Sequence, residues 1–183
     1  SISLDHASAG ILGFGPIGFS VLLAAQAAGG RQFFVTDKID DRLKTARQQG
    51  VNYTGNPLTR DIVKEINETE QNQLDVVYEC CGDQEAIDQA IDILKPGGKL
   101  MIIGIPESER MSFDVSKMRH KEITIQNVRR QVDCVQQAID LIANKKISLE
   151  GFVTHRFTFD QTTEAFDLVE QYQDGVMKAM VTI

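Results

Sequence analysis

Residues 9–18 read A-G-I-L-G-F-G-P-I-G, and this stretch decides the fold. A short apolar run enters a G-x-G-x-x-G turn, and Pro16 stands where the first turn of a following helix would begin. The string alone is a weak signal, because it occurs often by chance. Its context strengthens it, since an acid, Asp37, ends the next apolar run nineteen residues after Gly18. The stretch therefore predicts a strand, a tight turn and a helix in direct succession.

The three glycines of the turn have separate roles in a dinucleotide-binding unit. Gly13 permits the tight turn, Gly15 removes the side chain that would block a pyrophosphate, and Gly18 allows the helix to pack closely on the strand. Free N–H groups and the dipole at the helix N-terminus favour a phosphate group there. We therefore expect the turn to bind the pyrophosphate of a dinucleotide. The alternative is a tight turn without a ligand.

Asp37 is the predicted specificity residue. A carboxylate at the end of the second strand can accept hydrogen bonds from the adenosine ribose hydroxyls and would repel a 2′-phosphate. This favours NAD over NADP, although Lys38 and Arg42 are close enough in the sequence to weaken the preference. Arg42 is expected beside the adenine or the ribose, with a solvated position on the helix face as the alternative.

The rest of the chain continues the alternation of strands and helices. Such alternation implies right-handed βαβ crossovers and a parallel sheet that is covered on both faces. The pattern predicts an α/β fold, a doubly wound parallel Rossmann sheet in the order 3-2-1-4-5-6, whose ligand lies above the carboxyl ends of the strands. The predicted strands are residues 9–14, 31–36, 51–53, 74–80, 99–104 and 122–128, and the predicted helices are residues 16–28, 38–49, 57–68, 84–94 and 132–143.

The last part of the chain departs from this alternation. Residues 152–159 and 177–183 read as strands around one helix, residues 161–172, although six strands are already assigned. We therefore expect a dinucleotide-binding domain at residues 1–150 and a C-terminal β-α-β appendage at residues 151–183.

Composition excludes several classes of protein. The chain has 183 residues, of which 42% are hydrophobic and 25% are charged, as in ordinary globular proteins. No apolar stretch reaches the roughly 18 residues of a membrane span, and the N-terminus lacks the basic region of a signal peptide. The net charge of −7 argues against nucleic acid as a partner, because a basic face would be expected. We expect neither a membrane nor a nucleic-acid partner.

The cysteines and histidines give no metal or nucleophile signature. Cys80 and Cys81 are adjacent and poorly placed for a disulfide, and with Cys134 they make an odd set. Free thiols in a reducing cytoplasm are expected. The adjacent pair is interpreted as two small apolar residues at a strand end, with a nucleophile or a metal ligand as the alternative. The three histidines have no partner at zinc-ligand spacing, so no metal site is expected in this chain.

Five segments together resemble a known family. G-F-G-P-I-G, V-T-D-K-I-D-D-R-L, D-V-V-Y-E-C-C-G, L-K-P-G-G-K-L-M-I-I-G-I-P and T-H-R-F are similar to segments of the zinc-type medium-chain alcohol and polyol dehydrogenases, especially the sorbitol, xylitol and threonine dehydrogenases. The resemblance runs from about Ile11 to the C-terminus. It implies NAD contacts at Gly13, Gly15, Pro16, Ile17, Gly18, Asp37 and Arg42, and a nicotinamide lining of Gly104, Ile105, Asn127, Val128 and Arg129.

The resemblance also implies a part that this sequence does not contain. Members of the family have a preceding catalytic domain of similar size, with a G-H-E segment and the cysteine, histidine and glutamate ligands of catalytic zinc. We therefore expect this chain to be the NAD-binding portion of a longer enzyme, with residues 151–183 packing on the catalytic domain. By the resemblance, zinc polarises an alcohol or polyol and hydride passes to the nicotinamide. This chain is expected to hold no zinc and no catalytic residue, and to be inactive alone.

Two alternative functions are a stand-alone NAD(H)-sensing module and an S-adenosylmethionine-dependent methyltransferase. The sensing module would require the C-terminal segment to complete a self-sufficient fold. The methyltransferase would share the acid after the second strand and the L-K-P-G-G-K-L segment, but it usually has a tighter G-x-G-x-G turn.

A homodimer is the expected assembly. Dehydrogenases of the family often dimerise by pairing their sixth strands, and residues 122–128 have an apolar character that suits an uncovered edge. Phe152, Val153, Phe157 and Phe159 would lack their usual cover, and exposed apolar surface of this kind usually finds a partner. We therefore expect the C-terminal segment to be swapped or packed on a neighbour.

Overall fold

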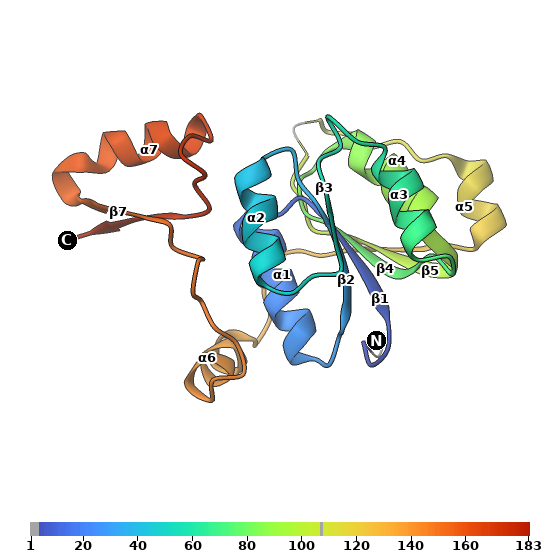
Figure 1. Ribbon diagram of the computed structural model, residues 1–183, viewed down its shortest axis with the longest axis horizontal. Helices are drawn as coiled ribbons and strands as arrows, with labels where there is room; N and C mark the ends of the chain where they lie inside the picture. The colour runs from blue at the N-terminus through green and yellow to red at the C-terminus, as the bar shows by residue number, and fades with distance from the viewer. Residues whose placement is uncertain (1–3, 107) are drawn as a thin grey trace.

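The computed structural model describes residues 4–106 and 108–183 and places six strands in one sheet (Figure 1). The strand order is β3-β2-β1-β4-β5-β6, and every neighbouring pair is parallel. This confirms the predicted α/β fold and its strand order. The strands are β1 (Ser8–Leu12), β2 (Gln32–Thr36), β3 (Tyr53–Gly55), β4 (Leu74–Glu79), β5 (Leu94–Ile102) and β6 (Thr124–Asn127).

Helices cover both faces of the sheet. Two lie on one face, α1 (Pro16–Ala27) and α2 (Asp40–Gln48). Three lie on the other, α3 (Ile62–Thr69), α4 (Gln84–Ile93) and α5 (Val115–Lys121) (Figure 1). This division follows from right-handed crossovers that run in opposite directions from β1, which places the change of direction between β1 and β4.

β1 lies in the middle of the sheet and separates two layers of the core. All five of its residues are buried, as expected for a parallel strand that is covered on both faces. Ala9 and Ile11 belong to the apolar cluster that contains α1 and α2, whereas Leu12 belongs to the cluster that contains α3 and α4. The carboxyl end of β1 is therefore held from both sides, which fixes where the glycine turn begins.

The structure corrects two predicted starts on one side of the sheet. β3 begins at Tyr53, two residues later than the predicted Val51. α3 begins at Ile62 instead of Pro57, because Asp61 is its cap and the Asp61 carboxylate accepts the amide of the third helical residue (3.1 Å). Residues 57–60 form a turn before this cap.

β5 begins earlier than predicted, at Leu94 instead of Lys99. Leu94 pairs with Leu74, and the register then shifts before Lys99 pairs with Val76. Gly97 lies between them with a φ of 75°, a left-handed conformation that favours glycine. The Pro-Gly-Gly turn is therefore an irregularity within the strand. The other predicted boundaries differ less from the observed ones.

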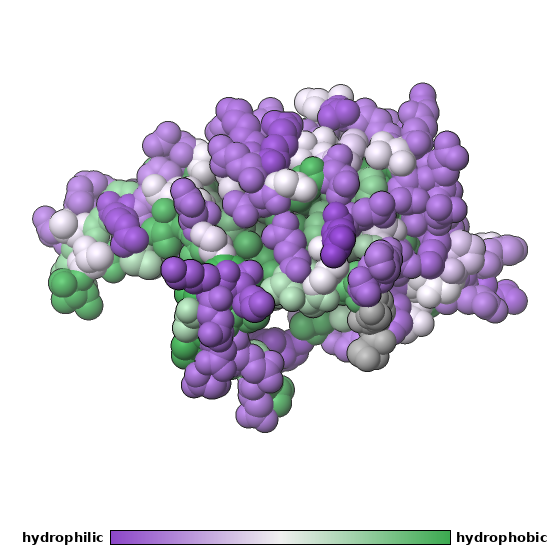
Figure 2. Space-filling model, turned by 60° about the horizontal axis from the view of Figure 1, so that its bottom comes forward, coloured by the Kyte–Doolittle hydropathy of each residue, from purple (hydrophilic) through white to green (hydrophobic). Residues whose placement is uncertain are grey.

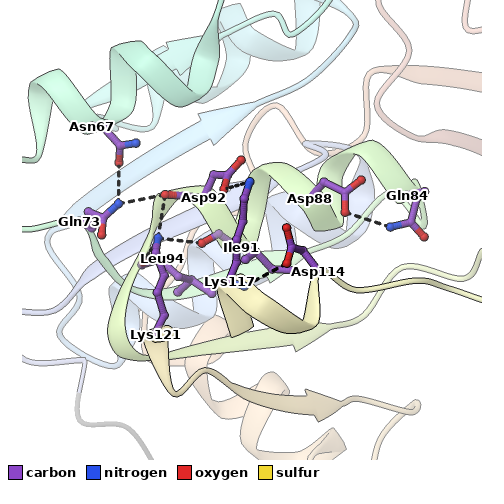
Figure 3. Close-up of polar contacts among 10 residues, drawn as sticks. All are labelled: Asn67, Gln73, Gln84, Asp88, Ile91, Asp92, Leu94, Asp114, Lys117 and Lys121. Carbon is purple, nitrogen blue, oxygen red and sulfur yellow. Dashed lines mark hydrogen bonds and ion pairs between the residues drawn. The ribbon is translucent and has the colours of Figure 1, made fainter. Parts of the chain in front are cut away.

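α5 lies in the stretch after β5 that the sequence left without a predicted helix. Lys121, at its end, donates hydrogen bonds to the carbonyl oxygens of Ile91, Asp92 and Leu94 at 2.6–3.0 Å (Figure 3). These carbonyls belong to the C-terminal end of α4, where the helix leaves acceptors without partners. A cation there also complements the helix dipole. Lys121 thus fastens α5 to α4.

The C-terminal unit, residues 152–183, forms the predicted β-α-β appendage. Its elements are β7 (His155–Thr158), a 3₁₀ turn (Phe159–Gln161), α7 (Thr162–Glu170) and β8 (Ala179–Thr182), and β7 pairs with β8 in a separate parallel sheet. The Phe152 ring lies 5.4 Å from the ring of Phe19 in α1, and Met177 is only 3% exposed in the cluster of α1 and α2. The unit therefore packs on its own chain, which corrects the expectation of a swapped or neighbour-packed segment.

α6 (Val135–Ala143) follows β6 at the edge of the sheet and buries none of its residues. Its apolar side chains Val135, Ile139 and Ile142 are exposed. Figure 2 shows a largely polar face on which apolar side chains gather in patches toward the side of the C-terminal unit. Within residues 4–106 and 108–183, no helix is long and apolar enough to cross a membrane.

Candidate functional site

The glycine turn joins β1 to α1 at the carboxyl edge of the sheet. Gly13 has a φ of 91°, and its amide donates to the Thr36 carbonyl at the end of β2 (2.8 Å). Gly15 is the cap residue of α1 and Pro16 follows at the first turn, so no side chain bonds to the first amides of the helix. Those amides have no partner within the helix either, which makes this N-terminus suited to an anion.

The surroundings of Gly15 and Gly18 differ in the way that the sequence predicts. A Cβ atom on Gly18 would overlap the Gly13 carbonyl oxygen, so α1 can approach β1 this closely only with glycine there. A Cβ atom on Gly15 would meet only the tip of the Arg42 side chain, with Nη1 at 3.3 Å. The turn is therefore rigid at Gly18 and open to a ligand at Gly15.

Asp37 lies at the end of β2 and is only 7% exposed. Its Oδ2 accepts a hydrogen bond from the Phe14 amide (2.6 Å), and its Oδ1 accepts one from the Ile39 amide (2.8 Å). The carboxylate therefore ties the glycine turn to the loop after β2, a structural role that the sequence did not predict. Each oxygen keeps acceptor capacity for a further donor.

A cavity of about 440 Å³ opens between the ends of β1, β2 and β4. This size falls within the range of small-molecule sites, and the place is the change of winding direction where such sheets bind ligands. Three of the predicted residues line the cavity, namely Gly13, Asp37 and Arg42, together with Lys38, Asp83 and Tyr172.

Each cation at this cavity faces a carboxylate. Lys38 donates to Asp83 at 2.6 Å, and Arg42 Nη1 lies 3.8 Å from Asp37 Oδ2. The hydrogen bond from Lys38 lowers the pKa of the Asp83 carboxyl below its ordinary value. The Arg42 Nε atom is buried and has no hydrogen-bond partner. The sequence placed both cations here, but it did not predict that acids would neutralise them.

The loops after β4 and β5 meet beside the glycine turn. Glu79, at the end of β4, is fully buried, and its Oε1 accepts the amides of Cys81 (2.7 Å) and Gly82 (2.6 Å). Its Oε2 has no partner and lies where a Cβ atom on Gly104 would be 2.7 Å away. Sequence reasoning missed Glu79, although an acid at the end of a buried strand was a usable signal.

The predicted nicotinamide residues lie at the same edge of the sheet, beyond the cavity. The Val128 amide donates to the Ile102 carbonyl (2.8 Å), so the ends of β5 and β6 are adjacent. Ile105 is 89% exposed, and Asn127 and Arg129 are exposed as well. Among the residues that the structure describes, the cavity lining includes none of these. Pro16 and Ile17 lie at the start of α1, likewise outside the lining.

The cysteines show no sign of a nucleophile. Cys80, Cys81 and Cys134 are free thiols. Burial raises the pKa of both adjacent thiols, that of Cys81 to about 12, with the Glu79 carboxylate adding to the effect. Both thiols are therefore protonated at neutral pH.

In the described part of the chain, residues 4–106 and 108–183, no three metal-binding side chains come together. His155 Nε2 lies 3.2 Å from an Asp174 oxygen, and His120 Nδ1 lies 3.2 Å or less from the Ser116 carbonyl oxygen, at 2.8 Å. The described residues therefore do not fit a zinc ion.

Comparison with known proteins assigns the chain to a family. A model of the zinc-binding dehydrogenases matches residues 16–144, which is more than half of the chain. The chain belongs to the zinc-binding dehydrogenase family. The match begins at Pro16, so it does not depend on Gly13 or Gly15, and the turn is an independent observation. The recognised resemblance to this family is confirmed.

Relatives of the chain carry the names of polyol-metabolising dehydrogenases. Sorbitol dehydrogenase of Bos taurus is 32% identical over 160 residues, covering 86% of this chain and 45% of that protein. D-xylulose reductase of Saccharomyces cerevisiae is 30% identical over 181 residues, covering 93% of this chain and 49% of that protein. The chain thus spans about half the length of the curated relatives that it matches.

A solved structure of this family's fold superimposes on nearly the whole chain. The 2R,3R-butanediol dehydrogenase of Bacillus subtilis has a TM-score of 0.88 and 24% identity, covering 98% of this chain and 51% of that one. At this identity the likeness concerns the fold. It includes the C-terminal unit as well as the six-stranded sheet.

Proposed function

We propose that the chain binds NAD(H) and is the cofactor-binding part of a zinc-dependent alcohol or polyol dehydrogenase. The observation that carries this proposal is the open N-terminus of α1, reached through Gly13 and Gly15 and adjoining the cavity that Asp37 lines. Family membership and the names of the relatives support the same function.

The residues of the turn fit a dinucleotide in two parts. The pyrophosphate lies at the first amides of α1, where the missing Cβ atom of Gly15 leaves room. The adenosine ribose lies in the cavity, where the Asp37 oxygens accept its hydroxyl hydrogens in addition to the two backbone amides that they already bind. Pro16, Ile17 and Gly18 hold the helix start in place.

The charges at the cavity support NAD over NADP. A 2′-phosphate would approach the buried Asp37 carboxylate, which repels it. The two cations that could offset this repulsion are each paired with an acid, Lys38 with Asp83 and Arg42 with Asp37. The nicotinamide, in this proposal, extends toward Gly104, Ile105, Asn127, Val128 and Arg129 at the ends of β5 and β6.

The function of the chain within the enzyme is binding and orientation. When bound, NAD accepts a hydride from an alcohol or polyol substrate. Catalytic zinc has no fitting ligand set in the described residues, so we derive no step through it. We propose that residues 1–150 form the dinucleotide-binding domain, that residues 151–183 also contact the rest of a longer enzyme, and that the chain alone does not oxidise alcohols.

Titration with NADH, followed by cofactor fluorescence, tests the proposal directly. The Gly15→Val variant should remain folded, because its side chain meets only the flexible tip of Arg42, and should lose at least about 100-fold in NADH affinity. Ala24→Val, on the exposed side of α1, is the matched control and should bind NADH normally. NADH binding by folded Gly15→Val with unchanged affinity would refute the site.

Two further measurements separate the alternative functions. Equal affinities for NADH and NADPH would contradict the specificity proposed for Asp37, and Asp37→Asn should narrow a difference between them. Binding of S-adenosylmethionine in place of NADH would favour a methyltransferase. Alcohol-dependent reduction of NAD by this chain, or one zinc ion per chain after dialysis against a weak chelator, would contradict a purely cofactor-binding role.

We also propose that the chain forms a homodimer through β6. β6 is an edge strand of the sheet, and an uncovered edge favours pairing with another chain. The exposed apolar side chains of α6 beside it add surface that association would bury. Light scattering should give twice the chain mass at micromolar concentration, and a monomer would refute the proposal.

A further inference from the structure

Tyr172, in the C-terminal unit, lies over the guanidinium group of Arg42 in α2. The guanidinium carbon is 5.2 Å from the centre of the Tyr172 ring, and both residues line the cavity at the ends of β1 and β2. We infer that Tyr172 is a positioning residue for dinucleotide binding, which acts by holding Arg42 beside the glycine turn and so couples cofactor binding to docking of the C-terminal unit. This inference rests on the proposed NAD(H) function.

The backbone directs Tyr172 toward the cavity. Tyr172 follows α7 with a φ of 52°, and the next amide, that of Gln173, donates to the Leu168 carbonyl (3.1 Å). This is the hydrogen bond that closes a helix end at a left-handed residue, a place where glycine is usual. A bulky residue is uncommon in that conformation. The aromatic side chain is therefore retained at a position where the backbone itself favours glycine.

Arg42 has a fixed place between the two units. Its Nη2 donates to the Val176 carbonyl of the C-terminal unit (3.4 Å), and its Nη1 lies 3.8 Å from Asp37. Its guanidinium tip is also the group that a Cβ atom on Gly15 would meet. The Nε atom is buried without a partner, so hydrogen bonds alone do not hold the group in place. The ring of Tyr172 supplies the remaining contact.

The position of Arg42 explains how the coupling works. A cation beside Gly15 and Asp37 attracts the pyrophosphate and limits the space around the ribose. A cation over an aromatic face is stabilised by the ring quadrupole, more strongly where water is excluded. Because binding free energies are reciprocal, a dinucleotide that binds better when Arg42 is held must in turn stabilise the docked C-terminal unit.

The test compares two substitutions of Tyr172 with one control. Tyr172→Phe keeps the aromatic face, whereas Tyr172→Leu removes it, and both keep the same left-handed backbone cost. Phe166→Leu removes an aromatic ring from α7 that is 71% exposed and does not line the cavity. NADH affinity is measured by fluorescence, and amide hydrogen exchange of residues 172–178 is measured with and without NADH. Circular dichroism checks that all variants are folded.

We expect Tyr172→Leu to weaken NADH binding by about threefold to tenfold, with Tyr172→Phe and Phe166→Leu within twofold of the unsubstituted chain. NADH should slow exchange in residues 172–178 of the unsubstituted chain and of Tyr172→Phe, and have less effect in Tyr172→Leu. Equal NADH affinity in folded Tyr172→Leu, or exchange that NADH does not change, would overturn the inference and leave the proposed function standing. Failure of the unsubstituted chain to bind NADH would overturn both.

Discussion

α4 and α6 each follow a strand of the same sheet and carry apolar residues at helical spacing, yet their environments are opposite. α4 buries five residues, including Ile87 and Ala90, whereas α6 buries none and leaves Ile139 exposed. The difference arises from the place of the preceding strand. β4 is next to the central strand β1, and β6 is at the edge of the sheet. An amphipathic pattern thus predicts a helix, but the sheet position decides whether its apolar face finds a partner within the chain.

The largest test of this comparison replaces one isoleucine in each helix. Ile87→Ala should lower the free energy of unfolding by about 4 kcal/mol, because the side chain is fully buried and its removal leaves a cavity. Ile139→Ala should cost less than about 1 kcal/mol, because the side chain is 51% exposed. Urea denaturation measures both. A cost for Ile139→Ala similar to that for Ile87→Ala would show that another chain covers α6 in solution.

The next test concerns the contact that ties α1 to the central strand. Gly18→Ala should cost about 3 kcal/mol, because its Cβ atom would overlap the Gly13 carbonyl oxygen and the backbone must move. Ala24→Val, on the exposed side of the same helix, should cost less than about 1 kcal/mol. Thermal unfolding compares the two. Equal stability of the two variants would mean that α1 and β1 are less closely packed than described.

A third test compares two lysines of α5 that bind α4 in different ways. Lys121→Ala should cost about 2 kcal/mol, because three carbonyls at the end of α4 lose a charged donor. Lys117→Ala should cost less than about 1 kcal/mol, since Lys117 makes an exposed ion pair with Asp92 (2.5 Å) (Figure 3). Denaturation of both variants at pH 7 gives the comparison. A smaller cost at Lys121 than at Lys117 would reject its role as the fastening residue.

The smallest expected effect is the pH dependence of the pair between Lys38 and Asp83, which joins the loops after β2 and β4. The hydrogen bond from Lys38 lowers the pKa of Asp83 in the folded chain, so between this pKa and the unfolded value near 3.9 the unfolded chain binds more protons. The contribution to stability is present above about pH 4 and is lost as the pH falls through the folded pKa. The pair is largely exposed, so its contribution should stay below about 1 kcal/mol.

Asp83→Asn keeps the cap that Asp83 provides for the Glu85 amide at the start of α4 (3.0 Å) and removes only the charge. Its free energy of unfolding should fall below that of the unsubstituted chain at pH 7, and the difference should vanish at low pH. A difference that is independent of pH would show that the ion pair is not its cause.

Local patterns were sufficient for most of the fold. The order of the six strands follows from the alternation of apolar runs and helices, because parallel strands need crossovers of one hand. The helix at residues 115–121 was not predicted, since few apolar residues mark it and its attachment depends on Lys121 and the distant end of α4. The start of α3 was misplaced because the capping preference of Asp61 outweighs that of Pro57.

The candidate site shows the same division. Gly13, Gly15 and Gly18 could be assigned from spacing alone, and the structure places them as predicted between β1 and α1. Sequence reasoning missed the buried carboxylate of Glu79 and the aromatic ring of Tyr172. Each acts on residues from other loops, so no local pattern marks it.

The sequence by itself determined the strand–turn–helix unit, the acid at the end of the second strand and the winding of the sheet. These depend on the conformational freedom of glycine, on hydrophobic periodicity and on the handedness of crossovers, all of which act over short stretches of chain. Only the tertiary structure decided that Asp37 binds the Phe14 amide, that Arg42 lies beneath Tyr172, and that α6 remains exposed. Arg42 and Tyr172 are 130 residues apart, and their contact exists because the C-terminal unit buries Met177 against α1 and α2.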